Sequence, residues 1–406
     1  MSTPSGPSAA TLTADTASPP RAAGHPWLAV LSVALSASVF CTTEFMPVGL
    51  LRYISEGLGV TSGLAGIMVT VPGVLAALAA PFLTVAVGRR DRRKVLLALG
   101  TLLLASNVVA MLAPNFAVLI LGRVLFGIGL GGFWAIGAGL GARLVPPASS
   151  GRATSIIFAG VSVGMLVGGA AGALIGDLYG WRTAFGVSAL LSALGLLAQF
   201  IWLPTLTVDE RIRTRDLLGI VGTRSGRIGL AAMALALCGQ FATYTFITPF
   251  LASQTGFDGK AISSILLGYT LVGIAGNFLG GATAGRSIKA TLLVTMGLFA
   301  VSVLLLPSLG HLKIATLVLL ALWGLAYGAM PVALQMWMVR SAPGAHEGAM
   351  ALFVANFQAS IALGSFLGGS IVDRVGMHSA MVFGGVVAIA AMLVLWRAPE
   401  EAAARP

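Results

Sequence analysis

The sequence predicts an all-α integral membrane protein in which twelve transmembrane helices form two pseudo-symmetric six-helix bundles. Three observations predict this fold: the composition, a series of long apolar spans and an internal repeat. Hydrophobic residues make up 57% of the 406-residue chain and charged residues 9%, and the mean hydropathy is +0.96. Because an ordinary soluble domain has about 25% charged residues, the composition excludes a soluble protein.

Apolar spans of about 20 residues recur along the chain, and each is long enough to cross a hydrocarbon core about 30 Å thick. They are rich in Leu, Ala, Val and Gly and do not alternate polar with apolar residues, which indicates helices rather than barrel strands. We place the spans at 27–51, 63–87, 95–113, 116–141, 153–176, 183–203, 227–252, 261–285, 290–308, 315–338, 349–372 and 379–396.

The segments outside the spans divide the chain into five parts. We expect disordered cytoplasmic tails at 1–26 and 397–406, six-helix bundles at 27–203 and 227–396, and a polar cytoplasmic linker at 204–226. Most of the 24 Lys and Arg residues fall on the side of the membrane that the termini share. The positive-inside rule therefore predicts cytoplasmic termini and a multi-pass protein of the cell (inner) membrane. Topology accounts for the net charge of +11, so we expect membrane lipid and no nucleic acid as a partner.

The two halves are related by an internal repeat. Gly168 and Asp177 of the first half recur at the same spacing as Gly364 and Asp373 of the second. Six spans in each half give the halves the same orientation. Such parallel repeats are typical of transporters that bind their substrate between the halves, near the bilayer midplane.

Glu44 is the one carboxylate that lies deep inside a predicted span. Holding a charge at the bilayer centre costs about 3 kcal/mol, so such a carboxylate is most often a proton or substrate site. The repeat places neutral Gln240 at the equivalent position of the second half. Arg123 lies at a similar depth, about 10–12 Å from the outer surface, and we expect an ion pair with Glu44, direct or through water. The alternative is that Arg123 extends to the surface and serves packing or topology.

Polar and aromatic residues at similar depth predict a solute-binding cavity between the halves. One carboxylate, one guanidinium and several rings suit a modest-sized, partly apolar solute. For the aromatic residues the alternative is lipid contact or core packing, and for Asn and Gln it is hydrogen bonding between helices. The candidate solute-binding residues are Phe40, Glu44, Phe45, Trp134, Gln240, Phe241, Tyr244, Tyr269, Tyr327, Asn356 and Gln358.

The sequence motifs restrict which energy source could drive transport. The chain has no G-x-x-x-x-G-K-[ST] loop and no set of catalytic or metal-ligating residues. We therefore expect neither ATP drive, nor an enzyme, nor a cofactor or metal. A proton gradient is left as the energy source, with protons as the coupled partner.

A stripe of glycines predicts helix packing in the fifth span. Small residues at every fourth position let two helices approach closely. The stripe consists of Gly164, Gly168, Gly172 and Gly176.

Three runs of residues resemble one transporter family. They are TEFMPVGLL at 43–51, GRVLFGIG at 122–129 and GMLVGGAAG at 164–172, the last followed by Gly180, Trp181 and Arg182. In these runs the chain resembles the major facilitator superfamily, specifically its twelve-span drug:proton antiporters, which include the chloramphenicol-resistance and arabinose-efflux-permease groups. The resemblance covers about residues 27–396 and implies a proton-transfer role for Arg123.

The resemblance also implies a gating loop between the second and third spans. Gly88 stands where the family usually has an Asp, so we expect the basic cluster without that gating salt bridge. Gly169 stands where the fifth helix of the family usually has Pro, which weakens the prediction of antiport relative to facilitated transport. The loop comprises Arg89, Arg90, Asp91, Arg92, Arg93 and Lys94.

The interpretation that we favour is a monomeric secondary active transporter. It would export a small, partly apolar drug or antibiotic, chloramphenicol-like, in exchange for protons by alternating access, with Glu44 and Arg123 coupling the protons. Sugar or nucleoside efflux and an uncoupled facilitator are the close alternatives. A membrane sensor or scaffold is less favoured, because the short loops contain no folded cytoplasmic domain.

Overall fold

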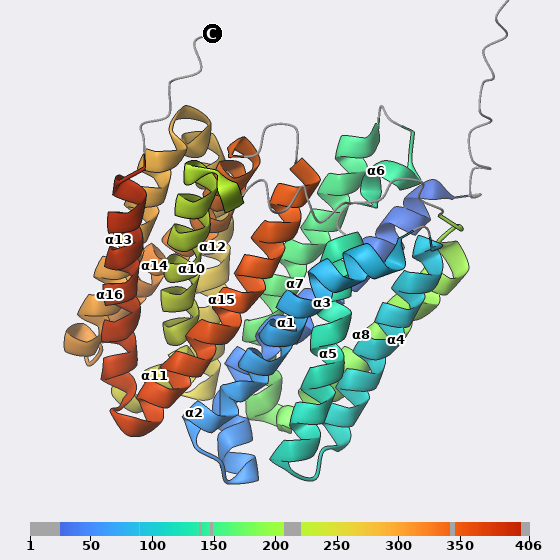
Figure 1. Cartoon of the computed structure of the whole chain (residues 1–406). Helices are drawn as coiled ribbons and strands as arrows, with labels where there is room; N and C mark the ends of the chain where they lie inside the picture. Colours follow the sequence, from blue (N-terminus) through green and yellow to red (C-terminus); the bar gives the residue numbers. More distant parts are fainter. Residues whose placement is uncertain are drawn as a thin grey trace, which may run out of the picture.

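The computed structural model describes residues 25–88, 90–137, 140–146, 149–206, 221–341 and 346–398. Within these ranges the regular structure is helical and includes no β-strand (Figure 1). The helices are α1 (Pro26–Leu58), α2 (Ser62–Ala65), α3 (Ile67–Val87), α4 (Arg92–Leu112), α5 (Phe116–Ile136), α6 (Gly141–Leu144), α7 (Ser150–Tyr179), α8 (Trp181–Trp202), α10 (Arg224–Tyr244), α11 (Ile247–Gln254), α12 (Gly259–Arg286), α13 (Ile288–Leu309), α14 (Lys313–Arg340), α15 (His346–Arg374) and α16 (Met377–Trp396).

Twelve helical segments of the described chain are long and apolar enough to span a membrane. They coincide with the twelve predicted spans, although several helices extend further than expected; α1, for example, continues to Leu58. The predicted fold class is therefore confirmed, and the chain is a multi-pass membrane protein. The predicted tail at 1–26 lies almost entirely outside the described residues, as does the middle of the predicted linker at 204–226.

Three predicted spans end or break where continuous helix was expected. They are 63–87, 116–141 and 227–252. The fourth span already ends at Ile136, and the short α6 follows it. The other two are divided, into α2 and α3 at Gly66 and into α10 and α11 at Phe246.

The two helix breaks lie against each other across the molecule. Pro249 offers no N–H to the carbonyl of Thr245, and its ring crowds that carbonyl, so α10 ends at Tyr244. The ring of Phe246 lies on Gly66, where an added Cβ would come within 2.6 Å of the ring. A residue larger than glycine at that break would therefore displace the Phe246 ring.

The helices form two bundles with the same internal contacts. In the first bundle α1 packs on α7 and α8, α3 on α5, and α4 on α5 and α8. In the second, α10 packs on α15 and α16, α12 on α14, and α13 on α14 and α16. Helix α1 begins and α16 ends at the same end of the molecule (Figure 1). We call this the terminal end and the opposite one the distal end.

The predicted packing glycines of α7, Gly164, Gly168, Gly172 and Gly176, all lie against α1. A Cβ on Gly164 would come within 2.2 Å of the Ser38 carbonyl oxygen, so no other residue permits this approach of the two backbones. In the second bundle Gly364 and Gly368 of α15 make the same kind of contact with the backbone of α10.

The two bundles contact each other along α3 and α15 and along α7 and α12. At the distal end, Asp373 of α15 accepts hydrogen bonds from the Thr61 hydroxyl at 2.6 Å and from the Gly63 backbone N–H at 2.9 Å. Deeper in the molecule, the Ser365 hydroxyl donates to the Gly66 carbonyl at 3.1 Å. These bonds hold the distal end closed between α2 and α15.

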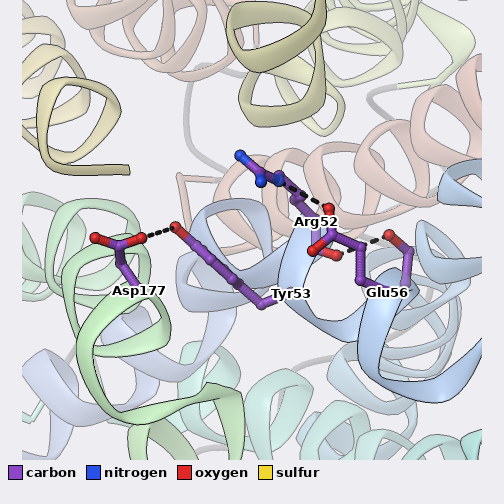
Figure 2. A network of polar contacts seen from close by, with 5 residues as sticks. Arg52, Tyr53, Glu56 and Asp177 are labelled. Atoms are coloured by element: carbon purple, nitrogen blue, oxygen red, sulfur yellow. Dashed lines mark hydrogen bonds and ion pairs between the residues drawn. The ribbon is translucent and has the colours of Figure 1, made fainter. Parts of the chain in front are cut away.

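Asp177 occupies the equivalent position at the end of α7. It accepts a hydrogen bond from the Tyr53 hydroxyl at 3.1 Å, and its carboxylate lies against Gly259 at the start of α12. Figure 2 shows Asp177 and Tyr53 pointing toward each other, with the ion pair of Arg52 and Glu56 beside them on α1. The repeat therefore places a carboxylate at both distal contacts between the bundles.

Gly164→Ala is expected to destabilise the protein by about 2 kcal/mol, because its Cβ would overlap the backbone of α1. Gly151→Ala is the matched control, since Gly151 starts the same helix and has no atom within 4 Å of its Cβ position. There the higher helix propensity of Ala predicts a gain of up to about 1 kcal/mol. Thermal unfolding in detergent measures both variants. Equal stability of the two would contradict the close packing of α7 on α1.

Candidate functional site

Glu44 lies in the middle of α1 and is 9% exposed. Its partner comes from the other bundle: the Gln358 side-chain N–H of α15 donates to Glu44 Oε1 at 2.9 Å. The sequence analysis places both residues in one cavity but does not predict this bond. The repeat relates Glu44 to Gln240 and carries no signal that would pair it with Gln358.

Two buried polar atoms near this bond have no hydrogen-bond partner within the described part of the chain. They are Gln358 Oε1 and the Tyr327 hydroxyl. The Trp134 indole N–H is close enough to act as a donor to Glu44, and Tyr327 is near enough to interact with its charge. Since buried polar groups are nearly always satisfied in folded proteins, this set of donors and acceptors is available to a polar ligand.

Arg123 of α5 is 1% exposed and does not form the expected direct ion pair with Glu44. The charged pair that the structure does form on α1 is that of Arg52 with Glu56. Arg123 Nε donates instead to the Met68 carbonyl at 2.9 Å, and Nη1 to the Thr43 carbonyl at 3.2 Å. The alternative interpretation, in which Arg123 extends to the surface, does not hold either.

Two prolines explain why the Arg123 guanidinium binds these two carbonyls. Pro47 in α1 lacks the N–H that would donate to the Thr43 carbonyl, and Pro72 in α3 lacks the one for Met68. An unpaired backbone carbonyl is costly in an apolar interior. Arg123 satisfies both and also lies over the Phe126 ring, 4.4 Å from its centroid. The prolines were the available sequence signal, and the sequence analysis does not use them.

A second polar network, also not predicted, supports the other side of this turn of α1. The Asn107 side-chain N–H of α4 donates to the Thr43 hydroxyl at 3.2 Å and to the Ser192 hydroxyl at 3.0 Å. Asn107 is completely buried. An Asn inside the predicted span 95–113 was the signal for it, because buried amides join membrane helices.

Gln240 is held entirely within the second bundle. Its Oε1 accepts from the Trp323 indole N–H at 2.6 Å, and its Nε2 donates to the Tyr269 hydroxyl at 3.2 Å. Both ends of the amide are therefore bonded within its own bundle, unlike Glu44, whose bond to Gln358 crosses to the other one. Trp323 is absent from the predicted site, although it is the largest fully buried side chain.

Aromatic rings gather around this amide and reach the first bundle. The rings of Phe45 and Phe241 stack across the two bundles with centroids 6.4 Å apart, and Tyr327 packs edge-on against Phe241. Tyr244 stacks on Tyr269 at 5.2 Å. The structure therefore brings five of the predicted solute-binding aromatics into one cluster beside Glu44.

Two other predicted solute-binding residues pack inside single bundles. Phe40 stacks on Phe133 with centroids 4.5 Å apart in the core of the first bundle. The Asn356 side-chain N–H donates to the Leu230 carbonyl at 2.9 Å, joining α15 to α10. These contacts agree with the alternative interpretation of the sequence, in which such residues pack in the core or form hydrogen bonds between helices.

The predicted gating loop is described except for Arg89 and contacts its own bundle. Asp91 Oδ1 accepts from the backbone N–H groups of Arg93 and Leu206, at 3.0 and 2.8 Å. Arg93 donates to the Phe200 carbonyl at 2.7 Å. Asp91 therefore caps α4 and fastens the chain that follows α8.

The described residues offer no site for a metal ion. No group of three or more His, Cys, Asp or Glu side chains close enough to bind one occurs among them. Cys41 and Cys238 are both buried and unpaired. The site is built from hydrogen-bonding groups around the Glu44 carboxylate.

The chain matches a family model described as Major Facilitator Superfamily over residues 29–221 and 229–406. The purine ribonucleoside efflux pump NepI of Shigella sonnei is 32% identical over 369 residues, which cover 91% of this chain and 93% of that protein. Pumps of the same name from Shigella flexneri and Salmonella enteritidis are 31% identical over the same shares of both chains.

Solved structures of two transporters are similar to this chain in fold. The nucleoside transporter NupG superposes with a TM-score of 0.76 at 13% identity, over 91% of this chain and 99% of NupG. A D-xylose–proton symporter superposes with a TM-score of 0.71 at 17% identity, over 92% and 97% of the two chains. At these identities the likeness shows the arrangement of helices alone.

Arg123→Met is expected to destabilise the protein by about 3 kcal/mol or more, because two buried carbonyls lose a charged donor. The substitutions Pro47→Ala and Pro72→Ala restore a backbone N–H to each of these carbonyls. In that double-alanine background, Arg123→Met should therefore lower the free energy of unfolding by about 1–3 kcal/mol less than it does in the wild type. A double-mutant cycle of unfolding free energies in detergent measures the difference. An equal cost in both backgrounds would show that these two bonds do not account for the burial of Arg123.

Proposed function

Since the chain belongs to the Major Facilitator Superfamily, we propose that this transporter exports a purine nucleoside, or a solute of similar chemistry, in exchange for protons. It is a multi-pass membrane transporter and not an enzyme. The observation that carries the substrate proposal is the identity of 31–32% along nine-tenths of the chain to pumps named for purine ribonucleosides. This favours the nucleoside alternative of the sequence analysis over a chloramphenicol-like antibiotic.

The site supports a solute of this chemistry. A purine base is a flat ring with hydrogen-bond donors and acceptors along its edge. Glu44, Trp134 and the unpartnered polar atoms of Gln358 and Tyr327 provide complementary acceptors and donors. The rings of Phe45 and Phe241 line the same region, and stacking on aromatic side chains stabilises a bound base by about 1–3 kcal/mol.

Proton exchange is assigned to Glu44. It is the carboxylate of the described chain that lies at mid-depth in a span, and a group held there at a cost of about 3 kcal/mol is expected to have a function. We propose that it binds either a proton or the solute as the two bundles alternate in opening. We also propose that the transporter is a monomer of the inner membrane with both termini in the cytoplasm. In that orientation the closed distal end faces the outside of the cell.

The test is flux into inside-out membrane vesicles that contain the wild-type protein or Glu44→Gln. An acidic vesicle interior should drive accumulation of a radiolabelled purine ribonucleoside by the wild type. Glu44→Gln should lower this accumulation about tenfold or more, because the amide does not titrate, while downhill exchange persists. Chloramphenicol and arabinose, added as competitors, compare the antibiotic and sugar alternatives with the nucleoside.

Glu56→Gln is the matched control, because Glu56 lies on the same helix and pairs with Arg52 at the exposed distal surface. It should leave accumulation unchanged. Accumulation that is independent of the pH gradient, and equal in the wild type and Glu44→Gln, would reject proton exchange in favour of an uncoupled facilitator. Competition by the antibiotic and not by the nucleoside would reject the proposed substrate.

A further inference from the structure

The hydrogen bond between Glu44 and Gln358 joins the two bundles near the middle of the membrane. Other side-chain hydrogen bonds between the bundles, within the described residues, lie nearer the distal end. They are made by Asp373 with Thr61 and Gly63, by Thr248 with Val48, and by Ser365 with Gly66. Of all these, the bond of Glu44 is the one that joins a mid-depth carboxylate to the opposite bundle.

Opening the distal end has to break this bond. Gln358 sits on α15, which packs on α3, and its backbone carbonyl would lie 2.9 Å from a Cβ added to Gly73. The Gln358 amide is therefore fixed on the second bundle, directly against the first. Separating α15 from α3 withdraws the amide from Glu44 on α1.

Losing the Gln358 donor is costly when Glu44 is ionised and no solute is bound. A buried carboxylate that loses a hydrogen-bond donor has its charge less well compensated, and charge-assisted bonds are about twice as strong as neutral ones. The titratable groups that face Glu44 are Arg123 of α5, Cys41 of α1 and Tyr327 of α14. Arg123 is held on the first bundle by its bonds to two backbone carbonyls, whereas the Gln358 amide reaches Glu44 from the second bundle.

We propose that Gln358 is a positioning residue that holds the empty, ionised transporter in its distal-closed arrangement. A proton releases it by neutralising Glu44, and a solute releases it by donating an N–H in place of the amide. The empty transporter does not change sides, and flux of one species then requires the other. This inference rests on the proposed exchange of solute for protons and adds the residue that enforces it.

Gln358→Leu tests the proposal in the same vesicles, because it keeps a side chain of similar size and removes the amide. Three rates are measured: accumulation driven by the pH gradient, downhill solute flux without a gradient, and solute-independent proton leak. The ratio of uncoupled to gradient-driven flux should rise between about tenfold and a hundredfold, the range expected for one bond to a charged group. A smaller fraction of folded transporter would lower all the rates by the same factor and leave this ratio unchanged.

Gln199→Leu is the matched control. Gln199 of α8 is also buried, and its Oε1 also lacks a partner within the described residues, but it lies within the first bundle. Its removal should leave the flux ratio at the wild-type value. A rise equal to that of Gln358→Leu would overturn the proposal, since loss of any buried amide would then uncouple transport.

The double variant Glu44→Gln with Gln358→Glu exchanges the two side chains and keeps one carboxylate bound to one amide. It should return the flux ratio toward the wild-type value, and it remains informative if Gln358→Leu does not fold. A fully coupled Gln358→Leu, or an exchanged pair as leaky as Gln358→Leu, overturns the proposal. Failure of the proposed function would be seen separately, because the pH gradient would then not drive solute accumulation by the wild-type protein.

Discussion

The rest of the structure depends on the hydrogen bonds that the Arg123 guanidinium donates to two backbone carbonyls. The guanidinium lies between two helices that each contain a proline, and it supplies the hydrogen bonds that Pro47 and Pro72 withhold from α1 and α3. In an apolar surrounding no solvent would do so. The turn of α1 that Arg123 supports is the turn that carries Glu44. One buried cation therefore permits two irregular helices and fixes the position of the carboxylate, without forming an ion pair with it.

Contact between the bundles depends on small residues and helix breaks as well as on apolar packing. Gly66 accepts the ring of Phe246, Gly73 the backbone of α15, and Gly63 the carboxylate of Asp373. Each contact brings a group of one bundle close to the backbone of a glycine in the other. Such contacts are specific in register, which suits the proposed alternation of the two bundles in opening.

Much of the fold follows from local sequence, and much of the site does not. Span length and composition predict all twelve helices, because backbone satisfaction in lipid leaves helix as the choice for a long apolar segment. The repeat correctly relates Asp177 to Asp373 and the glycines of α7 to those of α15. The same repeat cannot pair Glu44 with Gln358, because that bond joins non-equivalent helices. Depth along a helix suggests an ion pair between Glu44 and Arg123, yet the freed carbonyls compete for the guanidinium and bind it.

Gln240 shows what the symmetry leaves open. A carboxylate at this position would still accept from the Trp323 indole, and the Tyr269 hydroxyl would turn to donate to it. Glutamine and glutamate codons differ by a single nucleotide. A single base change, giving Gln240→Glu, would therefore place a carboxylate in the second bundle. The Trp323 indole and the Tyr269 hydroxyl already provide two hydrogen-bond donors for it. Under the proposed proton exchange, such a change would alter the number of charges moved per cycle without altering the shape of the transporter.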